Sequence, residues 1–360
     1  MSARAGIRGY GVFIPQHRLR VEDIWNAWCH RLRPSSVEQR LGIKEKAVNS
    51  WHEDVITMAS DAGKAALEMA GTDLQKIKAL YMGTCTNPYV TRASMTLVAE
   101  SLGLGPELMG GDCQFGGKSG TMALQACLGM VAAEIIPGGM VAASDSLSSH
   151  VAPNDLPLEY SASAGAAAFI VAREGVIAEI EGTFSYATET ADFFRLDGDR
   201  YIKRGVSTED EEIGYRDHLL TASREFMARF SFKPSDFNYA ALQQPNGTLP
   251  LEVGRGIGFE DDQLLPVLLA DQIGDCGSAS ALLALVAALD QANPGERIFL
   301  ASYGYGAGCD LFCLKVTEEI DKARSRRNSY PTLKAQLEKK SYLDYMTYIR
   351  FERKLIQEYI

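Results

Sequence analysis

The stretch Cys113–Thr121, CQFGGKSGT, is the first place in the chain where residue types and spacing suggest covalent chemistry. An extended segment turns through two glycines and enters the apolar run MALQACLGMVAAEII. This order predicts a strand, a glycine elbow and a buried helix. Such an elbow presents one side chain and several backbone N–H groups at a helix N-terminus, where the dipole favours an anion or a thiolate. The residue at its tip is Gly117, so the predicted nucleophile site lacks a nucleophile.

The cysteines are the next candidates for a nucleophile. Cys113 lies on the predicted strand, four residues before Gly117, where an apolar, buried role is favoured. Cys85, in the loop GTCTNPY, is expected to face the same cavity, although no nearby base is evident. Cys276 sits at a second elbow, and Cys309 and Cys313 lie four apart on a predicted strand, which favours core packing.

Composition narrows the function classes. The chain has 360 residues, is 46% hydrophobic, and carries a net charge of -10 with a pI near 5.2, which argues against nucleic acid or an anionic membrane surface as partner. Its seven cysteines are scattered, with no CxxC pair and no Cys/His cluster, so we expect neither a disulfide framework nor a bound metal. With no secretory signal and no membrane span in the sequence, we expect a cytoplasmic protein.

The elements around the elbow occur twice. Gly120-Thr121, an apolar helix, Pro137-Gly138 and a strand are echoed by Gly277-Ser278, a second apolar helix, Pro294-Gly295 and another strand, with the same spacing. We therefore predict an α/β fold of two pseudo-repeated halves, at 1–175 and 176–330, and a C-terminal extension at 331–360. The apolar helices lack a polar face and are predicted to lie between two sheets.

Motifs along nearly the whole chain resemble the thiolase superfamily, in its hydroxymethylglutaryl-CoA synthase and ketoacyl synthase III branch. They include GYGVFIP, PYVTRASMTLVAESLG, YSASAGAAAFIV, QQPNGTLP and LEKKSYLDY. GTCTNPY, QFGGKSGT, GDRYIKRG and SYGYGAGCD are more similar still to the synthase-III-like subunit of the bacterial monoacetylphloroglucinol acetyltransferase complex. The resemblance implies a five-layered thiolase-like fold. For that complex it also implies a thiolase-like partner that carries catalysis, a small zinc-ribbon/OB-fold protein, and homodimerisation within a hetero-oligomer.

The resemblance also implies four reacting positions, all of which carry other residues here. Cys85 stands where the family has a carboxylate, and Gly117 where it has the nucleophilic cysteine. Gln243 stands in place of a histidine, and Asp275 in place of an asparagine. The five histidines (His17, His30, His52, His150 and His218) match none of these positions, and each is predicted to be structural or on the surface. In SYGYGAGCD, Gly304, Gly306 and Gly308 are expected to line the acyl cavity, where their N–H groups could form an oxyanion hole.

We therefore predict a non-nucleophilic, synthase-III-like member of an acyltransferase complex with several subunits. It would not be catalytic on its own, and its thiolase-like partner would transfer an acetyl group to a carbon atom of a small, phenolic acceptor. It would bind no cofactor directly, apart from a coenzyme A thioester. One alternative is a stand-alone acyltransferase with reassigned residues such as Cys85 or Cys113 and Asp275. The other is a genuine hydroxymethylglutaryl-CoA synthase, against which Gly117 argues.

Overall fold

The computed structural model describes residues 5–29, 33–156, 158–190, 192–205 and 211–355. The first half contains β1 (Gly6–Phe13), α3 (Val55–Ala70), β4 (Ala79–Gly83), α4 (Ser94–Ser101), β5 (Met109–Cys113), α5 (Ser119–Ala132), β6 (Gly138–Ser146) and β7 (Ala164–Ala172). The second contains β8 (Ala178–Ala187), α7 (Glu211–Phe230), β11 (Tyr239–Leu242), α8 (Leu249–Ile257), α9 (Asp261–Leu264), α10 (Ala270–Ile273), α11 (Ser280–Gln291), β12 (Arg297–Gly304) and β13 (Gly308–Val316).

The strand pairings repeat between the halves. In the first, β1 and β7 are antiparallel, β7 and β6 are antiparallel, and β6 and β4 are parallel. In the second half, β8 and β13 are antiparallel, β13 and β12 are antiparallel, and β12 and β11 are parallel. β1 and β8 meet along a short antiparallel contact, which joins the strands into the order β11-β12-β13-β8-β1-β7-β6-β4-β5.

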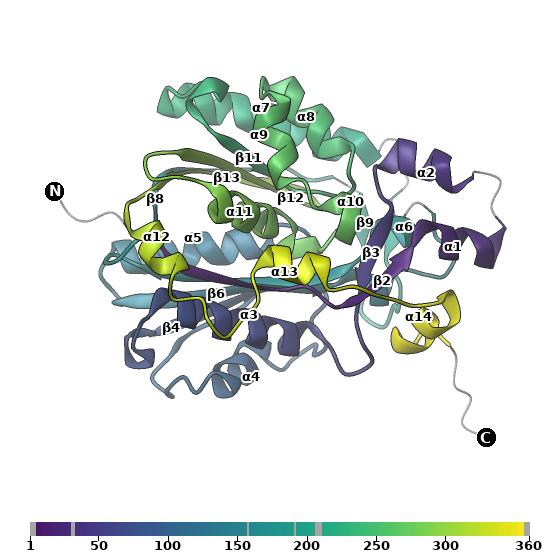
Figure 1. Cartoon of the computed structure of the whole chain (residues 1–360), viewed down its shortest axis with the longest axis horizontal. Helices are drawn as coiled ribbons and strands as arrows, with labels where there is room; N and C mark the ends of the chain where they lie inside the picture. Colours follow the sequence, from purple (N-terminus) through teal and green to yellow (C-terminus); the bar gives the residue numbers. More distant parts are fainter. Residues whose placement is uncertain (1–4, 30–32, 157, 191, 206–210, 356–360) are drawn as a thin grey trace.

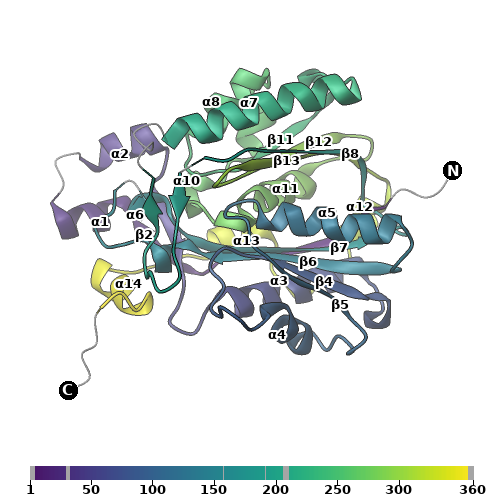
Figure 2. The same cartoon turned by 180° about the vertical axis from the view of Figure 1, so that it is seen from behind.

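This continuous sheet folds into two layers, β11-β12-β13-β8 and β1-β7-β6-β4-β5, each called a sheet below, within a five-layered arrangement (Figures 1 and 2). Helices α7 and α8 cover the outer face of the β11-β12-β13-β8 sheet, and α3 and α4 cover the outer face of the other sheet. Between the sheets lie α5 and α11, as predicted from their apolar sequences. This confirms the predicted thiolase-like α/β architecture.

The two central helices are not equally buried. In α11 the residues from Ser280 to Leu289 are all buried, because sheets lie on both sides. In α5 the buried residues alternate with partly exposed ones, and Gly129 is exposed. The side chain of Gln125 accordingly turns outward and bonds Ser185 Oγ on β8 at 3.0 Å. The prediction that neither helix has an exposed side is therefore correct for α11 only.

Short elements gather at one end of the molecule. A small sheet of β14 (Ser341–Tyr342), β2 (His17–Arg20) and β3 (Glu45–Val48) lies near α1 (Val21–Trp28), α2 (Pro34–Leu41), α6 (Leu158–Ser161) and α14 (Tyr345–Phe351) (Figure 1). The remaining elements are α12 (Glu319–Arg324), α13 (Leu333–Glu338) and the hairpin β9 (Phe193–Phe194) and β10 (Lys203–Arg204). No helix in the described part of the chain is long and apolar enough to cross a membrane.

Candidate active site

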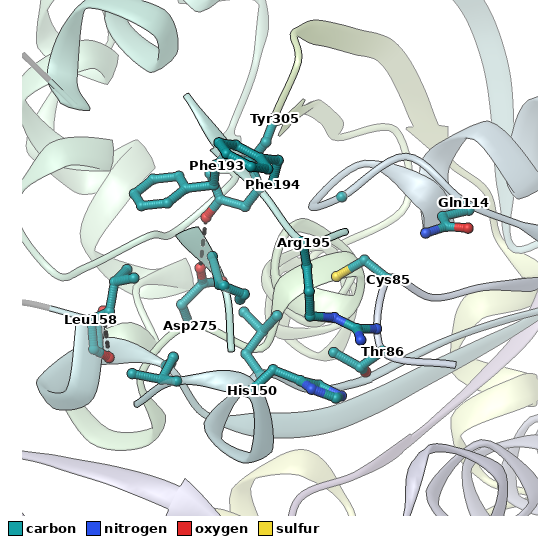
Figure 3. A pocket seen from close by; sticks show the side chains of 16 residues that line it. Cys85, Thr86, Gln114, His150, Leu158, Phe193, Phe194, Arg195, Asp275 and Tyr305 are labelled. Carbon is teal, nitrogen blue, oxygen red and sulfur yellow. Dashed lines mark hydrogen bonds between the residues drawn. The ribbon is translucent and has the colours of Figure 1, made fainter. Parts of the chain in front are cut away.

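A cavity of about 190 Å³ lies where loops from both halves meet. The loop after β4, the elbow before α5, and the 3-10 helix η2 (Leu147–His150) after β6 contribute from the first half. The hairpin β9–β10, the loop before α11 and the turn between β12 and β13 contribute from the second. Figure 3 shows the side chains that converge on it. The lining residues are Cys85, Thr86, Gln114, Gly116, Leu147, His150, Val151, Leu158, Ser161, Ala162, Phe193, Phe194, Arg195, Ile202, Asp275 and Tyr305.

The elbow has the predicted strand-turn-helix form, and its tip has no room for a side chain. Gly117 has a φ of 83°, a conformation that L side chains rarely adopt. A Cβ built there would lie 2.5 Å from the backbone oxygen of Tyr303 and 3.3 Å from Gly304 Cα. The absence of a nucleophile at this position is therefore accompanied by close backbone packing of β12 against the elbow.

Cys85 brings a thiol to the cavity beside the elbow. A Cβ built on Gly116 would lie 3.9 Å from Cys85 Cβ, so the cysteine and the glycine turn are neighbours. The Cys85 thiol donates to Asp145 Oδ2 at 3.1 Å. Burial, followed by the charge of Asp145, raises the pKa of the Cys85 thiol well above its usual value, whereas a hydrogen bond from the backbone N–H of Gly117 opposes this shift. The resting group is consequently a thiol.

Asp145, at the end of β6, organises the loop that carries Cys85. Its Oδ1 accepts from Thr84 Oγ1 at 2.8 Å, from the Cys85 backbone N–H at 2.8 Å, and from Thr86 Oγ1 at 2.7 Å. Its Oδ2 accepts from the backbone N–H of Ser278 at 2.7 Å. These donors satisfy both oxygens of a fully buried carboxyl group. It therefore links the first half to the start of the second buried helix.

Asp275 is the second acid–base group of the cavity. Burial raises its pKa to about 7, although the backbone N–H of Gly277, at 2.9 Å, opposes the shift. Tyr305 OH lies 3.5 Å from Asp275 Oδ2, a long contact that a bound molecule could replace. Near neutral pH the carboxyl group is divided between its protonated and ionised forms, which suits proton donation and acceptance.

Gln243 does not line this cavity. It is buried at the end of β11, where its Nε2 donates to the carbonyl of Gly277 at 2.9 Å. Its Oε1 has no hydrogen-bond partner among the described residues. The position at which the resemblance implies a histidine therefore links β11 to the second elbow.

None of the three glycines predicted to line the cavity is among its lining residues, whereas Tyr305, which lies between Gly304 and Gly306, is. Gly304 packs against the elbow, since a Cβ there would lie 2.6 Å from the Gly116 carbonyl oxygen. The Tyr305 backbone N–H donates to that same oxygen at 2.8 Å, and its ring meets Phe193 edge-on at 4.8 Å. No donor of an oxyanion hole is defined by these contacts, so that role stays a prediction.

The other candidate cysteines lie outside the cavity. Cys113 ends β5 and is half-buried against the core, and burial raises its pKa. Cys309 and Cys313 are buried, as predicted for core packing, and Cys276 at the second elbow is buried as well. Lys118, which follows the elbow, is also buried, and its ammonium group pairs with Asp310 at 2.7 Å. No group of three or more metal-ligating side chains occurs within the described ranges.

Sequence reasoning missed one histidine and most of one wall of the cavity. His150 lines the cavity, with Phe193 and Phe194 across from it and the Arg195 side chain extending toward it (Figure 3). Ile202, from the same β9–β10 hairpin, also lines the cavity. The hairpin falls in the charged segment 192–216, which has no clear periodicity and resembles a surface insertion. Its adjacent phenylalanines were the available signal. Of the other histidines, His218 is buried with bonds to Thr188 Oγ1 and the Gly214 carbonyl, and His30 lies outside the described residues.

Comparison with known sequences identifies full-length relatives, although no family model matches. The chain is 40% identical over 354 residues to the hydroxymethylglutaryl-CoA synthase of Methanopyrus kandleri, covering 98% of this chain and 99% of the relative. It is 38% identical over 351 residues to that of Methanocaldococcus jannaschii, with 98% and 99% covered.

Solved structures share the fold. One is MvaS in complex with 3-hydroxy-3-methylglutaryl coenzyme A, at a TM-score of 0.86 and 22% identity, with 99% of this chain and 93% of that chain covered. Another is an HMG-CoA synthase complexed with CoA, at a TM-score of 0.84 and 22% identity, with 96% and 90% covered.

These relatives correct the predicted function. The prediction of a non-nucleophilic subunit that is not catalytic on its own is wrong, because relatives matching over nearly their entire length are named as synthases. The four changed positions, taken together, predicted lost chemistry, and full-length relatives named as synthases contradict that inference. The cavity retains a thiol and a titratable carboxyl group within the intact frame. The chain belongs to the hydroxymethylglutaryl-CoA synthase family.

Proposed function

We propose that this protein is a coenzyme A thioester condensing enzyme of the hydroxymethylglutaryl-CoA synthase type, in which Cys85 carries the acyl group. One observation carries the proposal: Cys85 is the one cysteine among the described residues that line the cavity, and it adjoins the elbow from which a nucleophile is missing. The relatives carry the same enzyme name, and two structural neighbours contain CoA or its hydroxymethylglutaryl thioester. These facts support a CoA thioester as the ligand of this chain.

The acylation step follows from the contacts of Cys85. Its sulfur attacks the carbonyl carbon of the thioester, and the bond from that carbon to the CoA sulfur breaks. The thiol proton has a direct acceptor in Asp145 Oδ2, 3.1 Å away. Because the pKa of Cys85 is raised, this proton must leave during the attack, and no standing thiolate precedes it. Asp275 can protonate the departing CoA thiolate, because its pKa of about 7 leaves it partly protonated.

The cavity has apolar side chains that could contact the carbon chain of a bound acyl group. Its apolar lining includes Leu147, Val151 and Leu158 from the first half and Phe193 and Ile202 from the hairpin. Polar side chains share this lining, and they are Cys85, Thr86, Gln114, His150, Ser161, Arg195, Asp275 and Tyr305. The apolar side chains can accommodate the carbon chain of a small acyl group, and the polar side chains can bind its oxygen atoms.

Acyl-enzyme trapping tests the proposal. The full chain is incubated with acetyl-CoA and analysed by intact mass and peptide mapping, beside Cys85→Ser and the matched control Cys113→Ser. We expect an acetyl adduct on Cys85 in the unaltered protein and in Cys113→Ser, and none in Cys85→Ser. Condensation with acetoacetyl-CoA, followed as CoA release, should be lost in the same variant. An adduct on Cys113 alone, or full condensation by Cys85→Ser, would refute the assignment.

Association with other chains stays a prediction. The closer resemblance to one member of the monoacetylphloroglucinol acetyltransferase complex rests on the sequence strings alone. The expected homodimer, the thiolase-like partner and the small zinc-ribbon/OB-fold protein depend on the same resemblance. Purification of the native protein under mild conditions, with mass analysis of whatever accompanies it, tests all three expectations together.

A further inference from the structure

His150 stands at the cavity in a defined chemical state. It ends η2, and its imidazole points into the space that also receives Cys85 and Arg195 (Figure 3). Its Nδ1 lies 3.1 Å from the backbone carbonyl oxygen of Arg200, in the β9–β10 hairpin. Because a carbonyl only accepts hydrogen bonds, Nδ1 must carry the proton. In the neutral ring, Nε2 then holds a lone pair and has no hydrogen-bond partner among the described residues.

Side-chain hydrogen bonds to Glu352 hold the segment that carries His150. Ser148 Oγ donates to Glu352 Oε1 at 2.6 Å, and Ser149 Oγ donates to the other oxygen of the same carboxylate. Ser149 Oγ is also within 2.6 Å of Ser146 Oγ, which accepts from Asn49 Nδ2 at 2.7 Å. Glu352 is buried and follows α14, so the C-terminal extension helps to fix the orientation of the imidazole.

The electrostatic surroundings keep this ring neutral. Burial lowers the pKa of His150, and the guanidinium group of Arg195 adds to the effect. The Arg200 carbonyl and the carboxylates of Asp145 and Glu352 act in the opposite direction and do not cancel it. At neutral pH the cavity therefore contains an unprotonated imidazole together with a carboxyl group, Asp275, that retains part of its proton.

We propose that His150 is a catalytic base of this cavity, which removes at Nε2 an α-proton from the acyl group carried on Cys85. The inference rests on the proposed function, since it presumes the acyl-enzyme. In the step, the α C–H bond breaks and its proton moves to Nε2. The resulting carbon forms a bond to the ketone carbon of a second thioester, and the ketone oxygen takes a proton from Asp275, which has regained one from solvent after acylation. The imidazole ends as imidazolium and Asp275 as carboxylate, so charge and protons balance.

Deuterium exchange isolates this step from acylation. The full chain is incubated with acetyl-CoA in D₂O, without a second substrate, and the deuterium content of the bound acetyl group is measured by mass spectrometry. The variant is His150→Asn, whose side-chain amide can still donate to the Arg200 carbonyl. The matched control is His52→Asn, at an exposed histidine. We expect His150→Asn to become acetylated normally while its exchange rate falls on the order of 10²-fold.

Two results would overturn the inference. One is an acetylated His150→Asn protein that exchanges as fast as the unaltered chain. The other, which does not depend on the folding of a variant, is an exchange rate in the unaltered chain that does not fall as acid protonates His150. The titrating and charged groups around it are Arg195, Asp145 and Glu352. Failure of the unaltered chain to form any acyl-enzyme would instead refute the proposed function, and this inference would fail with it.

Discussion

Gly117 offers a sharp test of the packing at the elbow, through the single substitution Gly117→Ala. The added methyl group would meet the Tyr303 carbonyl oxygen at 2.5 Å, a contact that backbone must move to relieve. The φ of 83° adds conformational strain of about 1–2 kcal/mol for a residue with a side chain. Overpacking against backbone adds roughly 1–3 kcal/mol. We therefore expect Gly117→Ala to lower the free energy of unfolding by about 2–5 kcal/mol.

A glycine on the helix that follows the elbow provides the control. Gly129 of α5 is exposed, and a Cβ added there meets nothing within 4 Å. Gly129→Ala should stabilise the protein by up to about 1 kcal/mol, because alanine is the better helix former. The two substitutions add the same methyl group with opposite expected signs.

Urea unfolding, followed by far-ultraviolet circular dichroism, measures both effects. The midpoint should fall for Gly117→Ala and rise slightly for Gly129→Ala, with unchanged slopes. A Gly117→Ala midpoint equal to or above that of the unaltered chain would refute the proposed packing at the elbow. For the same reason, Gly117→Cys should not simply restore a nucleophile, since its Cβ meets the same backbone.

Three further changes probe the site and its support. Lys118→Met leaves the fully buried Asp310 carboxylate without its cation, and should lower the free energy of unfolding in urea at pH 7 by about 3–5 kcal/mol. The control Lys64→Met, at an exposed ion pair, should lower it by less than about 1 kcal/mol. Equal costs for the two substitutions would contradict this. The folded pKa of Asp275, about 7, exceeds the ordinary aspartate value of 3.8, so this group costs stability increasingly as pH rises between those values. As pH rises from 4 to 8, the free energy of unfolding of Asp275→Asn should therefore increase by up to about 4 kcal/mol relative to that of the unaltered chain. The condensation activity of this variant should fall. A difference in urea midpoints that does not change with pH would contradict the raised pKa. Glu352→Ala frees Ser148 and Ser149 beneath His150 and should lower the kcat of condensation more than the yield of acyl-enzyme, and an unchanged kcat would show that the support is dispensable.

Much of the fold could be predicted because its signals are local and repeated. The apolar run after Gly120 and its echo after Gly277 place two buried helices, and matched Pro-Gly turns place the strands that follow. Element ends were less certain. The strand predicted to start at Cys113 in fact ends there, since β5 runs over Met109–Cys113 and the chain then leaves the sheet. Propensity does not mark that point, because pairing with β4 decides it.

The site could be predicted only in part. Cys85 and Asp275 were singled out by position within motifs, and the structure brings both to one cavity. Gln243, chosen in the same way, faces elsewhere. His150 and the hairpin at Phe193 could not be placed, because their approach depends on contacts between distant segments, such as His150 with Arg200 and Phe193 with Tyr305.

The sequence by itself determined the duplicated architecture, the absence of a side chain at the elbow, and the thiol and carboxyl group near it. These properties follow from residue type and from short-range periodicity. Only the tertiary structure decided that Gly117 is closed off by Tyr303, that Cys85 donates to Asp145, and that His150 faces the cavity with Nε2 unprotonated. The reason is physical: bond partners and burial set the protonation of a group, and both are supplied by residues far away in the chain.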